Sequence, residues 1–302
     1  MRAILNRVAD FKVHRRTHAR PLTGQTWGLV FSKSSTRTRV SFEVGIRELG
    51  GDALFLSAVD IQLGRGEPIR DTARVLGRML HGAVIRTFAQ SDVEDFAAFS
   101  GIPTVNALTD DEHPCQILTD IFTFEERRRE SITGKVVTFF GDGACNVPVS
   151  WIFAAARLGF DLRIAAPRKY WPAAEVLQRV GVAGPSADSA SSTRRVIGAG
   201  SLQLMEDVVL AAKGADLLYT DVWVSMGKEA EKAERLQDLG GYQLNEALVI
   251  IARPDALVMH CLPAYRGLEI SETTLESHAD TIFTQAENRL HTQKAILAWL
   301  VG

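Results

Sequence analysis

The stretch Phe31-Ser32-Lys33-Ser34-Ser35-Thr36-Arg37-Thr38-Arg39 decides the fold. The apolar run at residues 27–31 predicts a buried strand, and the apolar spacing at 40–49 predicts a helix that ends at Gly50-Gly51. At such a turn, backbone N–H groups and the helix dipole favour an anion, and Arg37 and Arg39 add planar donors suited to phosphate. The alternative is a capped helix with two solvated arginines. The density of hydroxyl and guanidinium groups favours an anion site.

Composition limits the classes of protein to consider. The chain has 302 residues, 46% of them hydrophobic, which is enough for two domains. Lys and Arg number 34 against 36 Asp and Glu, so no basic excess indicates a nucleic-acid partner. Apolar stretches fall short of the ~18 residues that indicate a membrane span, and no signal peptide is visible. Three widely spaced cysteines have no metal-type spacing and favour a reduced, cytoplasmic setting.

Strand and helix patterns alternate along the chain, and a second series of this alternation begins after residues 131–134. Such alternation predicts an α/β fold. We expect two doubly wound domains, each with a central, mainly parallel sheet flanked by helices. The predicted strands are 27–31, 52–57, 83–88, 103–108, 136–140, 162–166, 202–205, 215–220 and 256–259. The predicted helices are 1–16, 40–49, 71–80 capped by Asp71, 113–124, one with Pro148 in its first turn that ends at residue 158, 206–213 and 290–300; a loop is expected at 184–193.

Five candidate site residues lie in or just after predicted strands. His113 and Gln116 flank a proline at a helix start, so both can face one point beyond the strand ends. Arg86 lies in an apolar strand, where an arginine is usually ion-paired or snorkelling. Asp221 follows a strand, the place where open α/β sheets bind ligands, although a helix cap is an equal alternative. Cys261 also ends a strand, where a cysteine is most often part of the core.

A dinucleotide fold is the main rival interpretation. A predicted strand runs into Gly141-Asp142-Gly143 before a helix, as in nicotinamide-binding domains. However, Asn146 occupies the third fingerprint position, and no acidic residue follows the strand at 162–166 to bind a ribose. The sequence therefore disfavours a nicotinamide enzyme.

Several motifs resemble one known family. The sequence Ser35-Thr36-Arg37-Thr38-Arg39 resembles the carbamoyl-phosphate signature of the aspartate/ornithine carbamoyltransferase family, and residues 113–116 resemble its H-P-x-Q motif. Residues 31–33, the D-x-W-x-S-M-G string at 221–227 and the H-C-L-P string at 260–263 resemble the ornithine branch. The resemblance runs from about residue 5 to residue 300.

The resemblance implies a reaction and a site. Carbamoyl phosphate would transfer its carbamoyl group to the δ-amine of L-ornithine, giving L-citrulline and phosphate, a step of arginine biosynthesis that needs no cofactor and no metal. An N-acylated ornithine or another amine is the alternative substrate, and a non-catalytic paralogue is a further alternative. The residues implied to bind carbamoyl phosphate are Ser35, Thr36, Arg37, Thr38, Gln62, Arg86, His113, Gln116, Cys261, Leu262 and Arg289. Those implied to bind ornithine are Asn146, Asp221, Ser225 and Met226, and those implied in catalysis are Cys261, His113, Asp221 and Arg37.

The resemblance also implies an organisation. Residues 1–131, with a returning C-terminal helix at 287–302, would form the carbamoyl-phosphate domain, and residues 132–286 the ornithine domain. Family members are built on cyclic trimers. We therefore expect a homotrimer in which Gln62 reaches the ligand of a neighbouring subunit.

Overall fold

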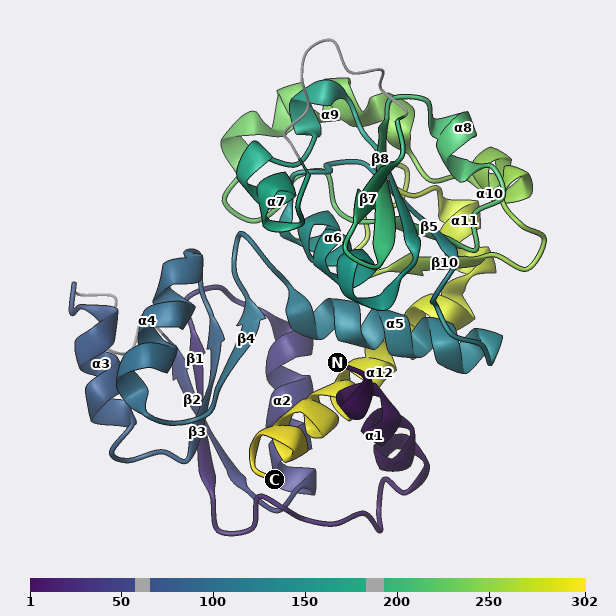
Figure 1. The fold of residues 1–302 in the computed structure, drawn as a ribbon. Coiled ribbons are helices and arrows are strands. Elements are labelled where there is room, and N and C mark those ends of the chain that lie inside the picture. The colour runs from purple at the N-terminus through teal and green to yellow at the C-terminus, as the bar shows by residue number, and fades with distance from the viewer. Residues whose placement is uncertain (58–65, 183–192) are drawn as a thin grey trace. The chain divides into compact units, whose positions relative to one another are not determined.

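The protein divides into two compact units in the computed structural model, which describes residues 1–57, 66–182 and 193–302 (Figure 1). Unit 1 comprises Met1–Phe122 and Glu287–Gly302, and unit 2 comprises Thr123–Ala286. The division falls within helix α5 (Pro114–Arg128), earlier than the crossing expected at residue 131. Gln62 and most of the expected loop at 184–193 lie outside the described residues.

Unit 1 is built on a four-stranded sheet of order β2-β1-β3-β4. Every pairing is parallel, so the carboxyl ends of its strands share one edge. Chain order reverses between β1 and β3, because β2 lies on one side of β1 and β3 on the other. The strands are β1 (Thr26–Phe31), β2 (Asp52–Ser57), β3 (Gly82–Arg86) and β4 (Thr104–Leu108).

Helices cover both faces of this sheet (Figure 1). On one face, Val30 and Ile85 pack against Phe96 of α4 in a buried apolar cluster that includes α3. On the other face, Phe42 and Ile46 of α2 are fully buried. The helices of unit 1 are α1 (Arg2–Val13), α2 (Thr36–Glu48), α3 (Ile69–Leu76), α4 (Gln90–Ser100), the first part of α5, and the later part of α12 (Ala279–Leu300).

Unit 2 is built on a six-stranded sheet of order β10-β9-β5-β6-β8-β7. Only the edge strand β7 runs antiparallel, to β8. Chain order reverses between β5 and β9. The strands are β5 (Val136–Phe140), β6 (Asp161–Ala165), β7 (Arg195–Ile197), β8 (Gly200–Met205), β9 (Leu217–Thr220) and β10 (Leu257–His260).

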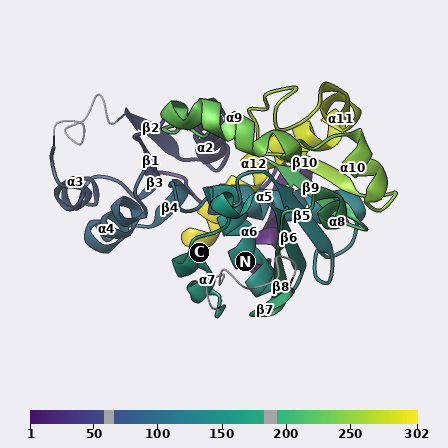
Figure 2. The same ribbon diagram turned by 90° about the horizontal axis from the view of Figure 1, so that it is seen from above.

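The second sheet is also covered on both faces, with α6 on one side and α8 and α10 on the other (Figure 2). Trp151 of α6 meets Tyr219 of β9 edge to face, with ring centroids 5.7 Å apart. On the opposite face Phe140, Leu218 and Leu248 belong to one buried cluster. Besides the remaining parts of α5 and α12, the helices of unit 2 are α6 (Asn146–Leu158), α7 (Ala174–Arg179), α8 (Val208–Ala212), α9 (Lys232–Leu239), α10 (Glu246–Ile251) and α11 (Glu272–Ser277).

The predicted fold class is confirmed, but three helix starts differ from the predictions. Helix α2 begins at Thr36, so the Ser/Thr/Arg cluster is its first turn. Helix α3 has Pro68 as its N-cap, and the prediction that Asp71 caps it is wrong; Asp71 lies inside the first turn. Helix α12 begins at Ala279, well before the predicted start. Local patterns locate helix boundaries poorly because tertiary packing can extend a helix beyond its periodic core.

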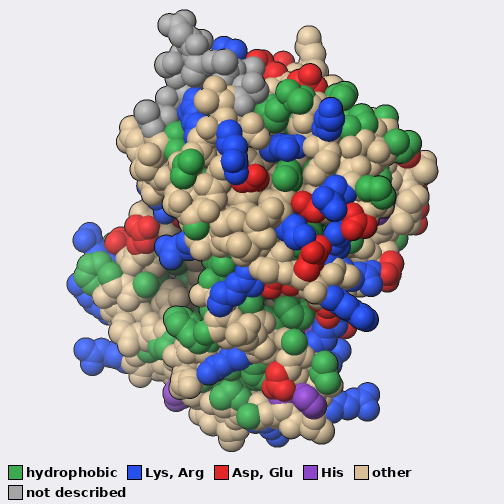
Figure 3. Space-filling model, turned by 45° about the vertical axis from the view of Figure 1, so that its right-hand side comes forward, with side chains coloured by type: hydrophobic (Ala, Val, Ile, Leu, Met, Phe, Trp, Pro, Cys, Tyr) green, Lys and Arg blue, Asp and Glu red, His purple; other side chains and the backbone are tan. Residues whose placement is uncertain are grey.

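The surface shows dispersed charge. Figure 3 shows basic and acidic side chains interspersed over the face that it presents. Among the described residues, no helix combines the length and the apolar character needed to cross a membrane.

Candidate active site

Unit 1 gathers its predicted site residues at the carboxyl edge of its sheet. Phe31, the last residue of β1, pairs with Arg86, the last residue of β3, and Arg86 pairs with Leu108 at the end of β4. Arg86 is itself the end of β3, and the segments after β1 and β4 carry Ser35–Arg37 and His113–Gln116. The edge lies at the point where strand order reverses, the usual ligand position of an open α/β sheet.

The first turn of α2 provides anion donors. Ser35 is the N-cap, and its hydroxyl accepts a hydrogen bond from the backbone N–H of Thr38 at 3.3 Å. Thr36 and Arg37 are exposed. The positive end of the helix dipole and the exposed Arg37 guanidinium therefore face solvent together, which suits a phosphate group.

Arg289 of α12 ties two of the predicted motifs together. Its guanidinium donates to Thr38 Oγ1 at 3.2 Å and to Gln116 Oε1 at 2.5 Å. The amide nitrogen of Gln116 in turn donates to Asp120 at 2.7 Å. A carboxamide has two donor hydrogens and two lone pairs, so these bonds fix the orientation of Gln116 and leave one of each for a ligand.

His113 lies buried in a cationic environment. Burial, together with the charges of Arg289 and Arg86, lowers the pKa of His113 well below its usual value. The imidazole is therefore neutral at physiological pH and can donate from only one nitrogen. Arg86 is 8% exposed, so the edge holds a nearly buried guanidinium.

Two other cations of this segment are engaged elsewhere in unit 1. Arg39 contacts Glu43 at 3.4 Å and lies over the Phe55 ring at 3.7 Å, so it is less available as a phosphate donor than the sequence suggested. Lys33 is buried, forms an ion pair with Asp110 and lies over the Phe88 ring. Lys33 thereby links the loop after β1 to the loop after β4.

Unit 2 repeats this arrangement with different side chains. Thr220, the last residue of β9, pairs with Phe140 at the end of β5 and with His260 at the end of β10. Asn146 follows β5 as the first residue of α6, while Asp221 and Cys261 directly follow β9 and β10. The structure thus brings the strand ends that carry the predicted amino-acid residues to one edge.

Asp221 and Cys261 are in direct contact. The thiol of Cys261 donates to Asp221 Oδ1 at 3.0 Å, and the same oxygen accepts from the N–H of Val222 at 2.7 Å. Burial raises the pKa of Asp221, although the nearby His260 and these hydrogen bonds oppose the shift. A buried carboxylate of this kind favours a cation as its partner.

The residues around Asp221 and Cys261 bear on the expectation that no metal binds. Asp221, His260 and Cys261 each present a potential ligand atom, and these atoms lie within 4.8 Å of one another. However, His260 Nδ1 accepts from the Leu262 N–H at 2.8 Å, and Nε2 faces Glu269 at 3.2 Å. The single lone pair of this imidazole is already occupied, so the set offers two ready ligands rather than three.

The His260–Glu269 pair shapes the turn after β10. Both side chains are fully buried, and Glu269 also accepts from the N–H of Tyr265 at 2.6 Å. Leu262 has φ = 56°, an uncommon left-handed conformation for a leucine, which often accompanies functional loops. Because its N–H is bonded to His260, only the carbonyl of Leu262 is left for the ligand contact that the resemblance implies.

The loop with Ser225 and Met226 is anchored by a pair that the sequence analysis missed. Arg235 of α9 donates to Asp142 at 2.6 Å and to the carbonyl of Trp223 at 3.2 Å. Asp142 lies in the turn after β5, close in sequence to Asn146, so this pair connects the two segments that carry the predicted ornithine residues. Met226 itself is 49% exposed.

The sequence contains one indication of the Arg235–Asp142 pair, which is the glycine beside Asp142. Gly141 has φ = 118°, and a Cβ there would lie 3.2 Å from the Trp223 indole. Gly141 therefore allows close packing of the β5 turn against the Trp223 loop. A search for acidic residues beside such glycines would have pointed to Asp142.

Comparison with known proteins identifies the family. Residues 1–126 match the carbamoyl-P binding domain of the aspartate/ornithine carbamoyltransferase family, and residues 133–300 match its Asp/Orn binding domain. The chain belongs to the aspartate/ornithine carbamoyltransferase family. The resemblance stated from the motifs is thereby confirmed.

The similar proteins described below are all named ornithine carbamoyltransferase. The ornithine carbamoyltransferase of Akkermansia muciniphila is 54% identical over 291 residues, covering 96% of this chain and 90% of the relative. Among solved structures, the anabolic ornithine carbamoyltransferase of Campylobacter jejuni matches with a TM-score of 0.87 and 39% identity, over 99% of this chain and 93% of that one. The enzyme of Pyrococcus furiosus matches with a TM-score of 0.86 and 41% identity, over 99% and 92%.

Proposed function

We propose that the protein transfers the carbamoyl group of carbamoyl phosphate to the δ-amine of L-ornithine, giving L-citrulline and phosphate. The observation that carries the proposal is the pair of sheet edges with opposite chemistry. One edge presents the helix start at Ser35, Arg37 and the buried Arg86, and the other presents the buried Asp221 in contact with Cys261. The first suits an anionic substrate and the second suits a substrate that carries ammonium groups.

In this proposal unit 1 holds carbamoyl phosphate. Ser35, Thr36, Arg37, Thr38 and Arg86 bind the phosphate group. His113 donates to the carbamoyl oxygen, where negative charge develops, and the free hydrogen and lone pair of Gln116 orient the carbamoyl amide. Arg289 keeps Gln116 in position through its 2.5 Å hydrogen bond.

Unit 2 holds ornithine. Asn146 donates to the α-carboxylate, Asp221 provides the negative charge for the ammonium groups, and Ser225 and Met226 line the aliphatic chain. The δ-amine resembles that of lysine, with a pKa near ~10.4, and must lose a proton before it attacks. Asp221 and Cys261 lie next to each other and are the groups best placed to stabilise the amine and assist that loss.

The chemistry requires no covalent enzyme intermediate. The nitrogen lone pair of the neutral δ-amine forms a bond to the carbamoyl carbon. The bond between that carbon and the phosphate oxygen breaks, and phosphate leaves with the electron pair. The attacking nitrogen gives up its extra proton. Orientation of the two reactants and stabilisation of the oxyanion account for the rate enhancement.

A direct assay tests the proposal. Purified protein is incubated with carbamoyl phosphate and ornithine, and citrulline and phosphate are quantified separately. We expect both products in equal amounts, because each transfer releases one phosphate. Phosphate release without citrulline would contradict the proposal, since it would indicate hydrolysis.

We also infer a homotrimer, the assembly that the resemblance implies. Large apolar side chains exposed on unit 1 support an interface between copies; they are Val75, Met79, Phe88 and Phe99. Light scattering should report three copies of the 33.1 kDa chain. An active monomer would contradict the inference.

We further propose that the protein acts in biosynthesis in the cytoplasm. The Campylobacter jejuni relative is described as anabolic, which supports a step in arginine biosynthesis. Cys115, Cys145 and Cys261 are free thiols, which favours a reducing compartment. Restoration of growth without arginine in a cell that lacks this activity would test the biosynthetic role.

A further inference from the structure

A second basic site lies at the opposite end of helix α2 from the proposed carbamoyl-phosphate site. A pocket of about 610 Å³ within unit 1 is lined by Arg15, Arg16, His18, Arg20, Arg47 and Glu48. The volume is in the range of small-molecule sites, roughly 300–1,000 Å³. Helix α2 has 13 residues and therefore spans about 20 Å. The pocket is thus separate from the first turn that carries Ser35 and Arg37.

The only acidic side chain of this lining, Glu48, is already paired with two cations. Glu48 accepts hydrogen bonds from Arg15 at 2.9 Å and from the fully buried Lys294 at 2.7 Å. Burial opposes ionisation of Glu48, but the bonds to Arg15 and Lys294 outweigh it and lower the pKa of the carboxyl. Glu48 therefore stays charged and bound to two cations, and the lining keeps an excess of positive charge.

One wall of the pocket is held in place by contacts of His18. The Lys294 ammonium lies 3.1 Å from His18 Nε2, and because an ammonium group only donates, Nε2 is the acceptor. His18 Nδ1 then carries the proton and donates to the Ala19 carbonyl at 2.8 Å. The imidazole also meets the Phe11 ring edge to face at 4.9 Å. His18 is thus fixed from three sides.

Arg20 is positioned by a glycine. Gly50 has φ = 91°, and a Cβ at this position would lie 2.7 Å from Thr23 Oγ1 and 3.2 Å from Arg20 Nε. Only glycine allows the arginine side chain to lie this close to the backbone in that conformation. The turn after α2 thereby brings the guanidinium of Arg20 to the pocket.

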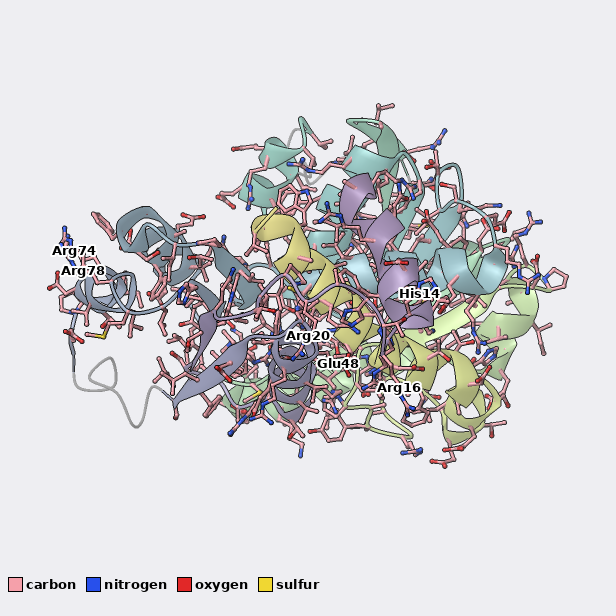
Figure 4. All side chains as sticks on the ribbon, turned by 90° about the horizontal axis from the view of Figure 1, so that it is seen from below. His14, Arg16, Arg20, Glu48, Arg74 and Arg78 are labelled. Carbon is pink, nitrogen blue, oxygen red and sulfur yellow. The ribbon has the colours of Figure 1, made fainter. Side chains whose placement is uncertain are left out.

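Two of the guanidinium groups are uncommitted. Within residues 1–57, 66–182 and 193–302, the guanidinium groups of Arg16 and Arg20 have no hydrogen-bond or ion-pair partner, whereas that of Arg47 pairs with Glu43 at 2.9 Å. Figure 4 shows Arg16 and Arg20 in the same part of unit 1 as Glu48. Two free guanidinium forks beside further arginines suit two adjacent phosphoryl groups, each of which can accept a bidentate contact.

We propose that this pocket binds a pyrophosphate group, supplied either by inorganic pyrophosphate or by a nucleoside di- or triphosphate. The lining gives four arginines against a single carboxylate, and the space exceeds what one phosphate needs. The net charge of the chain is -2, so the basic character is local and selects a small anion rather than a nucleic acid. The inference does not depend on the reaction proposed above.

Calorimetry with matched variants tests the proposal. All arms carry Arg37→Ala, which removes the proposed carbamoyl-phosphate site as a competing anion site. In that background we expect inorganic pyrophosphate to bind with one site per chain. Adding Arg16→Gln and Arg20→Gln should weaken binding at least tenfold, because both free guanidinium groups are lost.

The control removes the same charge elsewhere. Arg74 lies in α3 and Arg78 follows its end, and both lie away from Arg16 and Arg20 (Figure 4). Arg74→Gln with Arg78→Gln should change the dissociation constant less than twofold. Equal weakening by both pairs would show only general electrostatic attraction and would overturn the proposal. Circular dichroism melts confirm that each variant is folded.

A second arm distinguishes the sources of the group. ATP is titrated under the same conditions as pyrophosphate. Tighter binding of ATP than of pyrophosphate would support a nucleotide ligand, and equal binding would support recognition of the pyrophosphate group alone. Absence of binding by both at millimolar concentration would overturn the proposal.

Discussion

The two units place their site residues at the same position of an open sheet, yet the chemistry there is opposite. In unit 1 the strand ends lie near Arg37, Arg86 and Arg289, and burial together with the charges of Arg289 and Arg86 keeps His113 neutral. In unit 2 the corresponding strand ends meet Asp221 and Cys261, which form one buried contact. Topology therefore selects where a ligand binds, and side chains select which ligand it is.

The supporting residues differ in the same way. Arg289 holds Gln116 from α12, so a cation orders the edge of unit 1. Glu269 holds His260, and Asp142 holds Arg235, so buried carboxylates order unit 2. The side chains that support the site are thus cationic in unit 1 and anionic in unit 2. The comparison predicts that substitutions in one unit affect one substrate and leave binding of the other nearly unchanged.

The largest effect is expected for Arg37→Ala. Loss of two charge-assisted hydrogen bonds, each about 1.5–3 kcal/mol, should weaken carbamoyl-phosphate binding by about 10³-fold, below detection by calorimetry. Arg39→Ala is the matched control, because Arg39 is already engaged by Glu43 and Phe55. Near-normal binding by Arg37→Ala, or equal losses in both variants, would refute the cationic assignment of unit 1.

Asp221→Asn comes next in expected effect. The change keeps the shape of the side chain but removes the charge that faces the substrate's ammonium groups, which should lower kcat/KM for ornithine by about 10²-fold. The dissociation constant for carbamoyl phosphate should stay within about twofold. A similar loss in both quantities, measured by steady-state kinetics and calorimetry, would mean that the variant disturbs the fold.

Arg235→Gln tests the anchor of the Ser225–Met226 loop. Loss of the bonds to Asp142 and Trp223 should raise KM for ornithine by about tenfold, with a smaller change in kcat, because the loop is misplaced but the reacting groups are kept. Arg168→Gln is the control, since Arg168 forms an exposed pair with Glu206 in the same unit. Equal KM values for the two variants would remove Arg235 from the account.

The sequence predicted most strands, and the positions of the motif segments after them, because both depend on local patterns. Each apolar run ends where a polar segment begins. It did not predict the Asp142–Arg235 pair, whose members are 93 residues apart and lie among other charged residues. Nor could it show that Arg39 turns toward Phe55, since that contact needs the neighbouring strand in place. Partners across long separations are set by the tertiary fold.

The smallest effect concerns pH and has opposite signs in the two units. The folded pKa of His113 is lowered below its unfolded value near 6.5, so its contribution to stability is present above pH 6.5 and is lost as pH falls. For each pH unit below 6.5, the free energy of unfolding falls by at most about 1.4 kcal/mol from this group. His113→Gln should therefore flatten the dependence of the unfolding free energy between pH 7.5 and 5.5.

The raised pKa of Asp221 acts in the other direction. A carboxyl whose folded pKa exceeds its unfolded value near 3.8 lowers stability as pH rises through that interval. Asp221→Asn should therefore remove a loss of stability on going from acid to neutral pH. Denaturant unfolding at a series of pH values measures how each substitution changes the slope of stability against pH relative to the wild type. Changes of the same sign in the two variants would contradict the assignments.

The selectivity of the wild-type protein among amines tests the central claim most directly. Citrulline or carbamoylated product is measured with free ornithine, Nα-acetylornithine and aspartate at fixed carbamoyl phosphate. An acylated α-amine loses its charge and gains bulk, which would leave Asp221 buried without a cation, so kcat/KM for ornithine should be higher by about 10³-fold or more. Equal kcat/KM for Nα-acetylornithine or aspartate would contradict the assignment of the acidic edge to ornithine.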